Sequence, residues 1–209
     1  MKFFSAGLAA LLLFTAPAEA STVFDLRDKG GWSNSFDFSE DGIGLSVFTG
    51  RQDGSNVTTN ANDWLYQSNG NGLGMYSHGN GKNKEIDGKN ANEAVQFLFD
   101  TAVQLVSITF GKVDGNDDFD FYFDDGSGLT EQQDDIDIPN GGKFSFADLW
   151  IGTLFGIGAD GQHDNFTIKK IEVAAVTAVP LPAAFPLFGA ALLGIGYMAR
   201  RRRTRAKQQ

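Results

Sequence analysis

The chain has 209 residues, 42% of them hydrophobic and none of them cysteine, and its formal net charge is −9. The lack of cysteine excludes disulfides, thiol catalysis and cysteine metal sites. The folded state is therefore expected to be stabilised by core packing, to which a bound metal ion could add. Residues 21–178 alone carry 25 acidic and 10 basic side chains, a formal charge of −15. Such a surface repels nucleic acids, so we expect no nucleic-acid partner.

Residues 1–20 have the composition of a secretory signal peptide. A basic residue near the start precedes an apolar stretch that has no polar face. Ala18 and Ala20 then match the small-residue cleavage pattern, so the mature chain is expected to begin at Ser21. The sequence therefore predicts export; a short N-terminal helix of the fold is the alternative.

Residues 21–178 show the short alternating runs and glycine-rich turns that are typical of an all-β domain. Ten runs are candidate strands: residues 22–26, 35–39, 43–50, 73–77, 94–100, 103–111, 119–125, 142–149, 151–159 and 165–176. We expect a two-sheet sandwich of jelly-roll type, whose interior suits the 19 phenylalanines. A β-helix is the alternative, although no fixed repeat supports it.

Alternation within these runs predicts which side chains face the core. Phe119, Phe121 and Phe123 are expected on one face of their strand, with polar residues and a tyrosine on the other. In an earlier run, Val106 and every second residue up to Phe110 are expected to share a face in the same way. Both runs therefore predict strands with one apolar side.

Residues 50–93 are rich in Asn, Gly and Ser. Apart from the candidate strand at 73–77, this composition is too polar for a core and predicts long surface loops. Such loops either carry a binding site or act as solvated connectors.

The strongest polar cluster is the segment from Asp114 to Gly128. Asp114, Asn116, Asp118 and Asp120 place oxygen ligands at alternating positions, the kind of donor set that calcium prefers. The segment does not match an EF-hand, because Phe119 stands where that loop needs glycine. A calcium site would be completed by some of Asp124, Asp125, Asp134, Asp135 and Asp137. Turn capping and solubility are the alternative roles of these acids.

The sequence favours no enzyme. The two histidines, His78 and His163, occur in loop-like segments, and no serine lies in a nucleophile-elbow motif. A carboxylate pair of the glycoside hydrolase type stays open, because the separation of two acids cannot be read from sequence.

Carbohydrate binding is a further hypothesis for a sandwich with aromatic side chains. The available aromatic residues are Trp32, Trp64, Tyr66, Tyr76 and Trp150. Aromatic residues of a sandwich also serve as core, so both roles are considered for each of them.

The C-terminal 31 residues, 179–209, contain three features in order. Residues 179–198 carry no charge and have about the length of a membrane-spanning helix. Pro186 lies inside this run and shortens the part that can form a regular helix. The arginines that follow are expected to hold that end in the cytoplasm, which leaves the acidic domain outside.

This segment resembles the PEP-CTERM class of bacterial sorting signals, in its VPLPA variant. The matching residues are the motif Val179, Pro180, Leu181, Pro182 and Ala183, then the apolar segment, then Arg200, Arg201, Arg202 and Arg203. The resemblance implies an exosortase-type membrane peptidase as partner, and a Gram-negative bacterium that makes extracellular polysaccharide.

These features predict three parts: a signal peptide at 1–20, a β-sandwich ectodomain at 21–178 and a sorting signal at 179–209. We expect an exported surface protein of structural or adhesive type, which resides in the inner membrane transiently and then at the cell surface or in the extracellular matrix. The alternative is a calcium-assisted carbohydrate-binding module of the polysaccharide matrix.

Overall fold

The computed structural model describes residues 20–77 and 84–176, and this part of the chain is entirely β. Its strands are β1 (Ser21–Asp25), β2 (Gly31–Ser33), β3 (Ser35–Glu40), β4 (Ile43–Asp53), β5 (Asn56–Thr58), β6 (Trp64–Ser68), β7 (Gly72–Tyr76), β8 (Ile86–Asp87), β9 (Glu93–Gly111), β10 (Asp118–Asp124), β11 (Leu129–Asp137), β12 (Lys143–Ser145), β13 (Ile151–Gly158) and β14 (Asn165–Ala175). The pairings between them are antiparallel. The all-β prediction is therefore confirmed.

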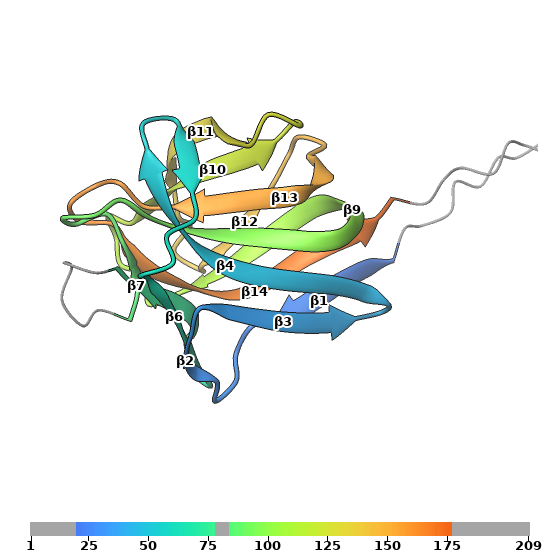
Figure 1. The fold of residues 1–209 in the computed structure, drawn as a ribbon, viewed down its shortest axis with the longest axis horizontal. Coiled ribbons are helices and arrows are strands. Elements are labelled where there is room, and N and C mark those ends of the chain that lie inside the picture. Colours follow the sequence, from blue (N-terminus) through green and yellow to red (C-terminus); the bar gives the residue numbers. More distant parts are fainter. Residues whose placement is uncertain (1–19, 78–83, 177–209) are drawn as a thin grey trace, which may run out of the picture. The chain divides into compact units, whose positions relative to one another are not determined.

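The long strand β9 joins the two layers of this sandwich-like fold. Its first half pairs with β4 and with most of β13, whereas its second half pairs with β14 and β12. Residues 100–102 between the halves are exposed, and β9 curves there at one end of the domain (Figure 1). The strands accordingly form one connected hydrogen-bonded network folded over the core, instead of the two separate sheets that we expected.

A second, smaller core, the outer core, lies on the side of some of these strands that faces away from the main core. From β9 the pairing continues through β13, β10, β11 and β5 and returns to β4, which itself pairs with β9. These strands enclose a small cluster of Val57, Ala94, Tyr122 and Leu129, against which Leu154 packs. Both sides of β10 are consequently buried along part of its length.

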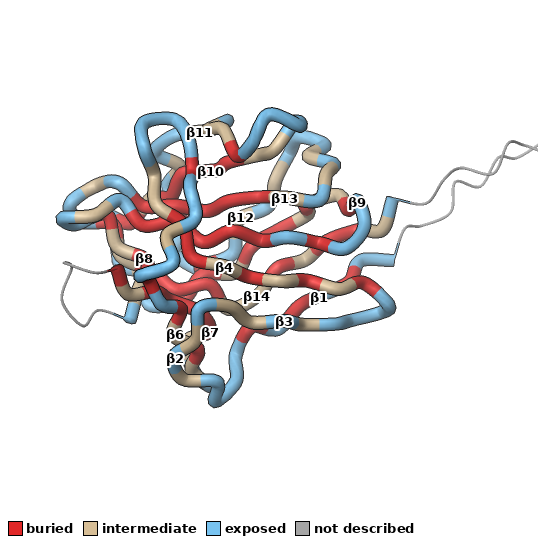
Figure 2. Tube along the Cα trace, in the orientation of Figure 1, coloured by how far each residue is buried: buried red, intermediate tan, exposed pale blue. Residues whose placement is uncertain are grey.

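The main core lies between the layers and is dominated by phenylalanine. Phe24 contacts Phe99 with ring centroids 5.7 Å apart, Phe99 contacts Phe155 at 5.9 Å, and Phe155 contacts Phe121 at 6.5 Å. The first two contacts are edge-on and the third is stacked, and both arrangements add to the stabilisation that comes from burial alone. Figure 2 shows the buried positions along the strands and the exposed positions in the connections.

The expected face of β10 is confirmed. Phe119 and Phe121 are fully buried in the main core and Phe123 packs against it, while Tyr122 belongs to the small outer cluster. The tyrosine and the phenylalanines thus face opposite sides of the strand, as a period of two requires.

The expected face of residues 103–111 is wrong at one position. Ser107 pairs with Glu172, but Leu105 pairs with Val173, so the register shifts at Val106. Such a bulge reverses the alternation locally. Leu105 is therefore buried in the core, whereas Val106 is only partly buried.

The expectation of long surface loops over residues 50–93 is also wrong in part. This segment contains the end of β4 and four further strands, β5 to β8. Leu65, Leu73, Met75 and Ile86 from these strands are fully buried. Because each strand has only two to five residues and glycines or polar residues surround it, the composition of the whole segment hides its apolar positions.

The two ends of the described domain lie side by side. Ser21, the first residue of β1, is paired with Ala174, next to the last residue of β14. β14 is flanked on its other side by β9 over residues 167–175. The C-terminal end of the domain is thus an interior strand of the network, bonded to a neighbour on each side.

We predict that Phe121→Ala lowers the free energy of unfolding by about 3–5 kcal/mol, because it leaves a cavity among several rings. Phe121 contacts Phe146 at 4.8 Å and Trp150 at 5.1 Å between ring centroids. Urea unfolding followed by tryptophan fluorescence measures the change. Leu149→Ala is the matched control, because Leu149 is 72% exposed and should lose less than about 0.5 kcal/mol. A loss of under about 1 kcal/mol for Phe121→Ala would contradict this packing.

Candidate functional site

A β-bulge in β11 places two acidic side chains beside a third on β10. Phe119 of β10 pairs with Ile136 and Phe121 pairs with Gln133, so Asp134 and Asp135 together oppose the single residue Asp120. Asp135 takes the left-handed conformation, with φ 49°, which the bulge imposes. The bulge therefore places two carboxylates of β11, where regular pairing would place one residue, opposite Asp120.

We call these residues the acidic cluster: Asp120, Asp134, Asp135 and Asp160. One carboxylate oxygen from each lies within 4.8 Å of the others. Asp120 is buried, whereas the other three are exposed, and Asp160 comes from the connection between β13 and β14. Oxygen ligands at such separations are a donor set for a hard cation such as calcium.

Asp120 lies at the floor of the acidic cluster and is 1% exposed. One carboxylate oxygen accepts a hydrogen bond from Gln52 Nε2 at 2.8 Å and the other accepts one from the backbone N–H of Asp135 at 3.1 Å. Gln52 reaches this position over Gly158, where a Cβ would lie 2.1 Å from Gln52 Nε2. A side chain at position 158 would therefore displace Gln52 from its hydrogen bond to Asp120.

The surroundings of Asp120 raise its pKa to about 7. Burial is the largest cause, and the charges of Asp160 and Asp134 add to it, while the two hydrogen bonds act in the opposite direction. A divalent cation would offset the repulsion between these carboxylates, which favours cation binding above neutral pH.

A second group of acids adjoins this one. The pKa of Asp118 is also raised to about 7, by burial and by the charge and hydrogen bond of Asp164. Asp117 is buried, and its carboxylate accepts hydrogen bonds from the backbone N–H groups of Asp114 and Asn165. Asp117 therefore acts as a structural link between the turn before β10 and the start of β14.

The structure separates the four calcium ligands that the sequence predicted. Asp120 belongs to the acidic cluster, and Asp118 lies close enough to Asp135 for their charges to interact. Asp114 and Asn116 instead lie exposed in a turn, where Asp114 Oδ1 accepts a hydrogen bond from the Asn116 backbone N–H at 3.2 Å. Asp114 accordingly has the turn-capping role that was the alternative for it, whereas Asn116 takes part in this turn through its backbone N–H.

Asp160 and Asp164 are site residues that sequence reasoning missed. They lie about forty residues after Asp120 in the chain, in the connection between β13 and β14. β10 pairs with β13, and Asp120 lies opposite Gly158, the last residue of β13. The connection that follows β13 therefore starts beside Asp120. Only this tertiary pairing relates the two segments.

The aromatic residues divide into two groups. Trp32, Trp64, Tyr66 and Tyr76 come from β2, β6 and β7, and the two tryptophans are more than 40% exposed. Trp150 packs against the main core instead, with ring contacts to Phe121 and Phe123. Trp150 is therefore structural.

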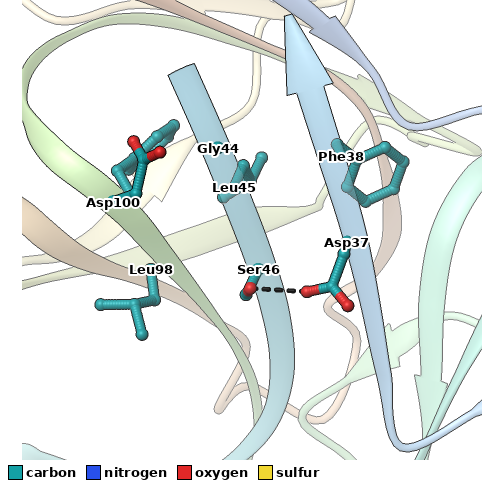
Figure 3. A pocket seen from close by; sticks show the side chains of 8 residues that line it. Asp37, Phe38, Gly44, Leu45, Ser46, Leu98 and Asp100 are labelled. Carbon is teal, nitrogen blue, oxygen red and sulfur yellow. Dashed lines mark hydrogen bonds between the residues drawn. The ribbon is translucent and has the colours of Figure 1, made fainter. Parts of the chain in front are cut away.

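A shallow groove of about 320 Å³ crosses the outer side of β3, β4 and β9. It is lined by Asp37, Phe38, Gly44, Leu45, Ser46, Leu98, Phe99 and Asp100. Ser46 donates a hydrogen bond to Asp37 at 2.6 Å, and the strand bearing Ser46 runs between Asp37 and Asp100 (Figure 3). The two carboxylates thus flank an open surface that does not exclude water.

Of the two histidines, the structure describes His163. His163 is exposed in the connection between β13 and β14, where its backbone carbonyl accepts a hydrogen bond from Asn165 Nδ2 at 3.0 Å. His78 lies outside the described residues.

The sorting features also lie outside the described residues. These are Ala18, the motif Val179 to Ala183 and the arginines from Arg200 to Arg203. Ala20 and Ser21 are described, and Ser21 begins β1. Over residues 20–77 and 84–176, no helix has the length and apolar character needed to cross a membrane.

No protein-family model, no curated protein and no solved structure matches this chain. Function is accordingly argued from the residues and their geometry.

The raised pKa of Asp120 predicts that the free energy of unfolding falls as the pH rises from about 4 to about 7. The unfolded chain releases this proton near its ordinary pKa of 3.8, but the folded chain holds it until about pH 7, so the folded state binds more protons in between. Ionising this one carboxyl costs on the order of 4 kcal/mol more in the folded chain than in the unfolded chain. Urea unfolding at pH 5 and pH 8 with a chelator measures the difference.

Asp120→Asn should reduce this dependence of the unfolding free energy on pH, because an asparagine amide does not ionise in this range. Asp125→Asn is the matched control, since Asp125 is exposed in a turn where hydrogen bonds from Ser127 lower its pKa. Equal pH dependence in the unsubstituted chain and Asp120→Asn would contradict the assignment.

Proposed function

We propose that the protein is an exported surface protein of structural or adhesive type, anchored by its C-terminal segment and then sorted by an exosortase-type peptidase. The observation that carries the proposal is the order of the VPLPA motif at 179–183, the apolar segment and the arginines, together with the signal-like residues 1–20. The first location is the inner membrane, and the final location is the cell surface or the extracellular matrix of a Gram-negative bacterium.

The described domain suits attachment through its C-terminus. β14 lies between β1 and β9, so a force applied after Ala175 acts along a strand that is bonded on both sides. An edge strand held by one neighbour would separate more easily. This arrangement supports a displayed domain held at its end.

We also propose that the sandwich is of the jelly-roll type. The two layers enclose one phenylalanine-rich core, and pairings between strands distant in the chain, such as β14 with β1 and β4 with β9, are those of a non-local β topology. A small outer core with residues from β5, β9, β10, β11 and β13 distinguishes it from a simple two-sheet sandwich.

We predict that the double substitution Pro180→Ala with Pro182→Ala blocks sorting, because it removes the motif that the peptidase would read. The substituted chain should accumulate in the membrane fraction, with at least about a tenfold loss from the surface fraction. Fractionation of cells that contain an exosortase-type peptidase, with detection through the domain, measures this. Pro186→Ala is the control, because it lies outside the motif and favours a longer helix. Equal distributions of the double variant and the unsubstituted chain would contradict the proposal.

The second candidate function is calcium-assisted carbohydrate binding in the polysaccharide matrix. The acidic cluster favours its calcium part, because four carboxylates, one of them buried, converge within 4.8 Å. Calcium would bind the ionised carboxylates and thereby stabilise the folded state by mass action.

Addition of millimolar calcium should therefore raise the unfolding midpoint at pH 8, and less so at pH 5, where Asp120 is protonated. Asp134→Asn and Asp160→Asn should each reduce the effect, and Asp125→Asn should leave it unchanged. An unfolding midpoint that calcium does not alter at pH 8 would exclude this candidate.

A further inference from the structure

The outer face of β2, β6 and β7 carries four aromatic side chains, Trp32, Trp64, Tyr66 and Tyr76, which we call the aromatic face. Trp32 pairs with Tyr66 across β2 and β6, and Trp64 pairs with Tyr76 across β6 and β7. Since Trp64 and Tyr66 are two residues apart on one strand, they point to the same side. Three short strands therefore present their rings together.

Three rings of the aromatic face, those of Trp32, Tyr66 and Tyr76, contact one another without being fully buried. The centroid of Trp32 lies 4.7 Å from that of Tyr66 and 6.1 Å from that of Tyr76. Trp32 is nevertheless 43% exposed and Trp64 is 42% exposed. Grouped exposed aromatic side chains are a feature of interaction surfaces, and two half-exposed indoles on one sheet face have this feature.

The same strands separate aliphatic from aromatic side chains by face. Leu65, Leu73 and Met75 point to the core and are fully buried. The outward positions of β6 and β7 are filled by aromatic residues, serine and glycine. A surface of rings without aliphatic side chains is suited to stacking on flat ligands that also need hydrogen bonds, because tyrosine and tryptophan each carry a polar group.

The three strands that form the aromatic face carry no charged side chain of their own, and Lys84 approaches them from a separate segment. None of the residues in β2, β6 and β7 is acidic or basic, although residues 21–178 together have a formal charge of −15. An anionic polymer would meet repulsion from the surrounding domain, and a cationic one would favour the acidic surfaces elsewhere. The charge pattern therefore points to a neutral ligand.

Lys84 marks one border of the aromatic face. Its ammonium lies 4.2 Å from the ring centroid of Tyr66. Its backbone crosses β7 closely, since a Cβ on Gly74 would lie 2.0 Å from the Lys84 carbonyl oxygen. Lys84 thus covers the Tyr66 side of the face, and the exposed indoles of Trp32 and Trp64 remain for a ligand.

We propose that the aromatic face binds a neutral polysaccharide, whose sugar rings stack on Trp32 and Trp64. The apolar C–H face of a sugar ring matches an indole, and the hydroxyl groups of the sugar match the indole N–H and the tyrosine hydroxyls. Several sugar units of one polymer can engage neighbouring rings, which strengthens weak individual contacts. This inference rests on the proposed adhesive role and names the class of ligand for it. It does not involve the acidic cluster, which lies on β10, β11 and the connection after β13.

The test is tryptophan fluorescence of the full chain in detergent micelles, titrated with soluble β-glucan, α-glucan and galactomannan, and with alginate as the anionic polymer. At least one neutral polymer should shift the emission to shorter wavelength and protect it from acrylamide quenching. Trp32→Ala and Trp64→Ala should each weaken binding of that polymer about fivefold or more. Trp64→Phe should restore part of the affinity, because it keeps a ring.

Leu98→Ala is the matched control, because Leu98 is a large apolar side chain 41% exposed on another strand, and it should leave binding unchanged. Near-ultraviolet circular dichroism shows whether each variant is folded. The protection of tryptophan emission from acrylamide is measured on the unsubstituted chain, so that part of the test does not depend on whether a variant folds. The proposal is overturned by binding to none of the neutral polymers, by binding to alginate alone, or by equal affinity in the alanine variants. It is also overturned if the face proves to join two copies of the chain, which sedimentation would show as self-association lost in Trp64→Ala.

This test is independent of sorting. A chain whose tail is never processed still binds the polymer if the aromatic face is a sugar site. A chain that fails to bind can still be sorted through residues 179–209.

Discussion

The structure depends on one strand, β9, which crosses from one layer of the sandwich to the other while keeping its apolar side on a shared core. Phe97 and Phe99 of its first half and Ile108 and Phe110 of its second half are all buried in the same cluster. The exposed residues 100–102 between them are where the strand bends. Because the chain has no cysteine, this packing holds the layers together without a disulfide. The interior is therefore fixed, and the candidate binding groups occupy the outer sides of the same strands.

Both candidate binding surfaces follow from strand geometry. On β10, the phenylalanines occupy the core side, so Asp120 faces the opposite side. The bulge in β11 then places Asp134 and Asp135 opposite Asp120, and a hydrogen bond from Gln52 fixes the buried carboxylate. On β6 the same alternation places Leu65 inside and the aromatic rings outside. One surface is thus suited to a cation and the other to a neutral ring, and no strand contributes to both.

Local sequence predicted the features that depend on a single strand. The alternation of Phe119 and Phe121 with Asp120 and the all-β class needed only the period of two. The bulge at Val106 could not be predicted, because it arises from the register of β14 against β9. The same holds for Asp160, which is placed beside Asp120 by a pairing between distant strands. In residues 50–93, the alternation of aromatic and aliphatic residues at Trp64, Leu65 and Tyr66 does indicate a strand. The many polar residues around it led to the prediction of surface loops instead.

The central claim is that this domain is exported and that its C-terminal segment is removed when it reaches its final location. The mass of the intact chain recovered from the cell surface or the medium tests this claim most directly. The account predicts a chain that begins at Ser21 and ends within or near the motif at residues 179–183, without the apolar segment and the arginines. A surface-exposed chain whose mass extends to Gln209 would contradict it, and the tail would then be a permanent anchor.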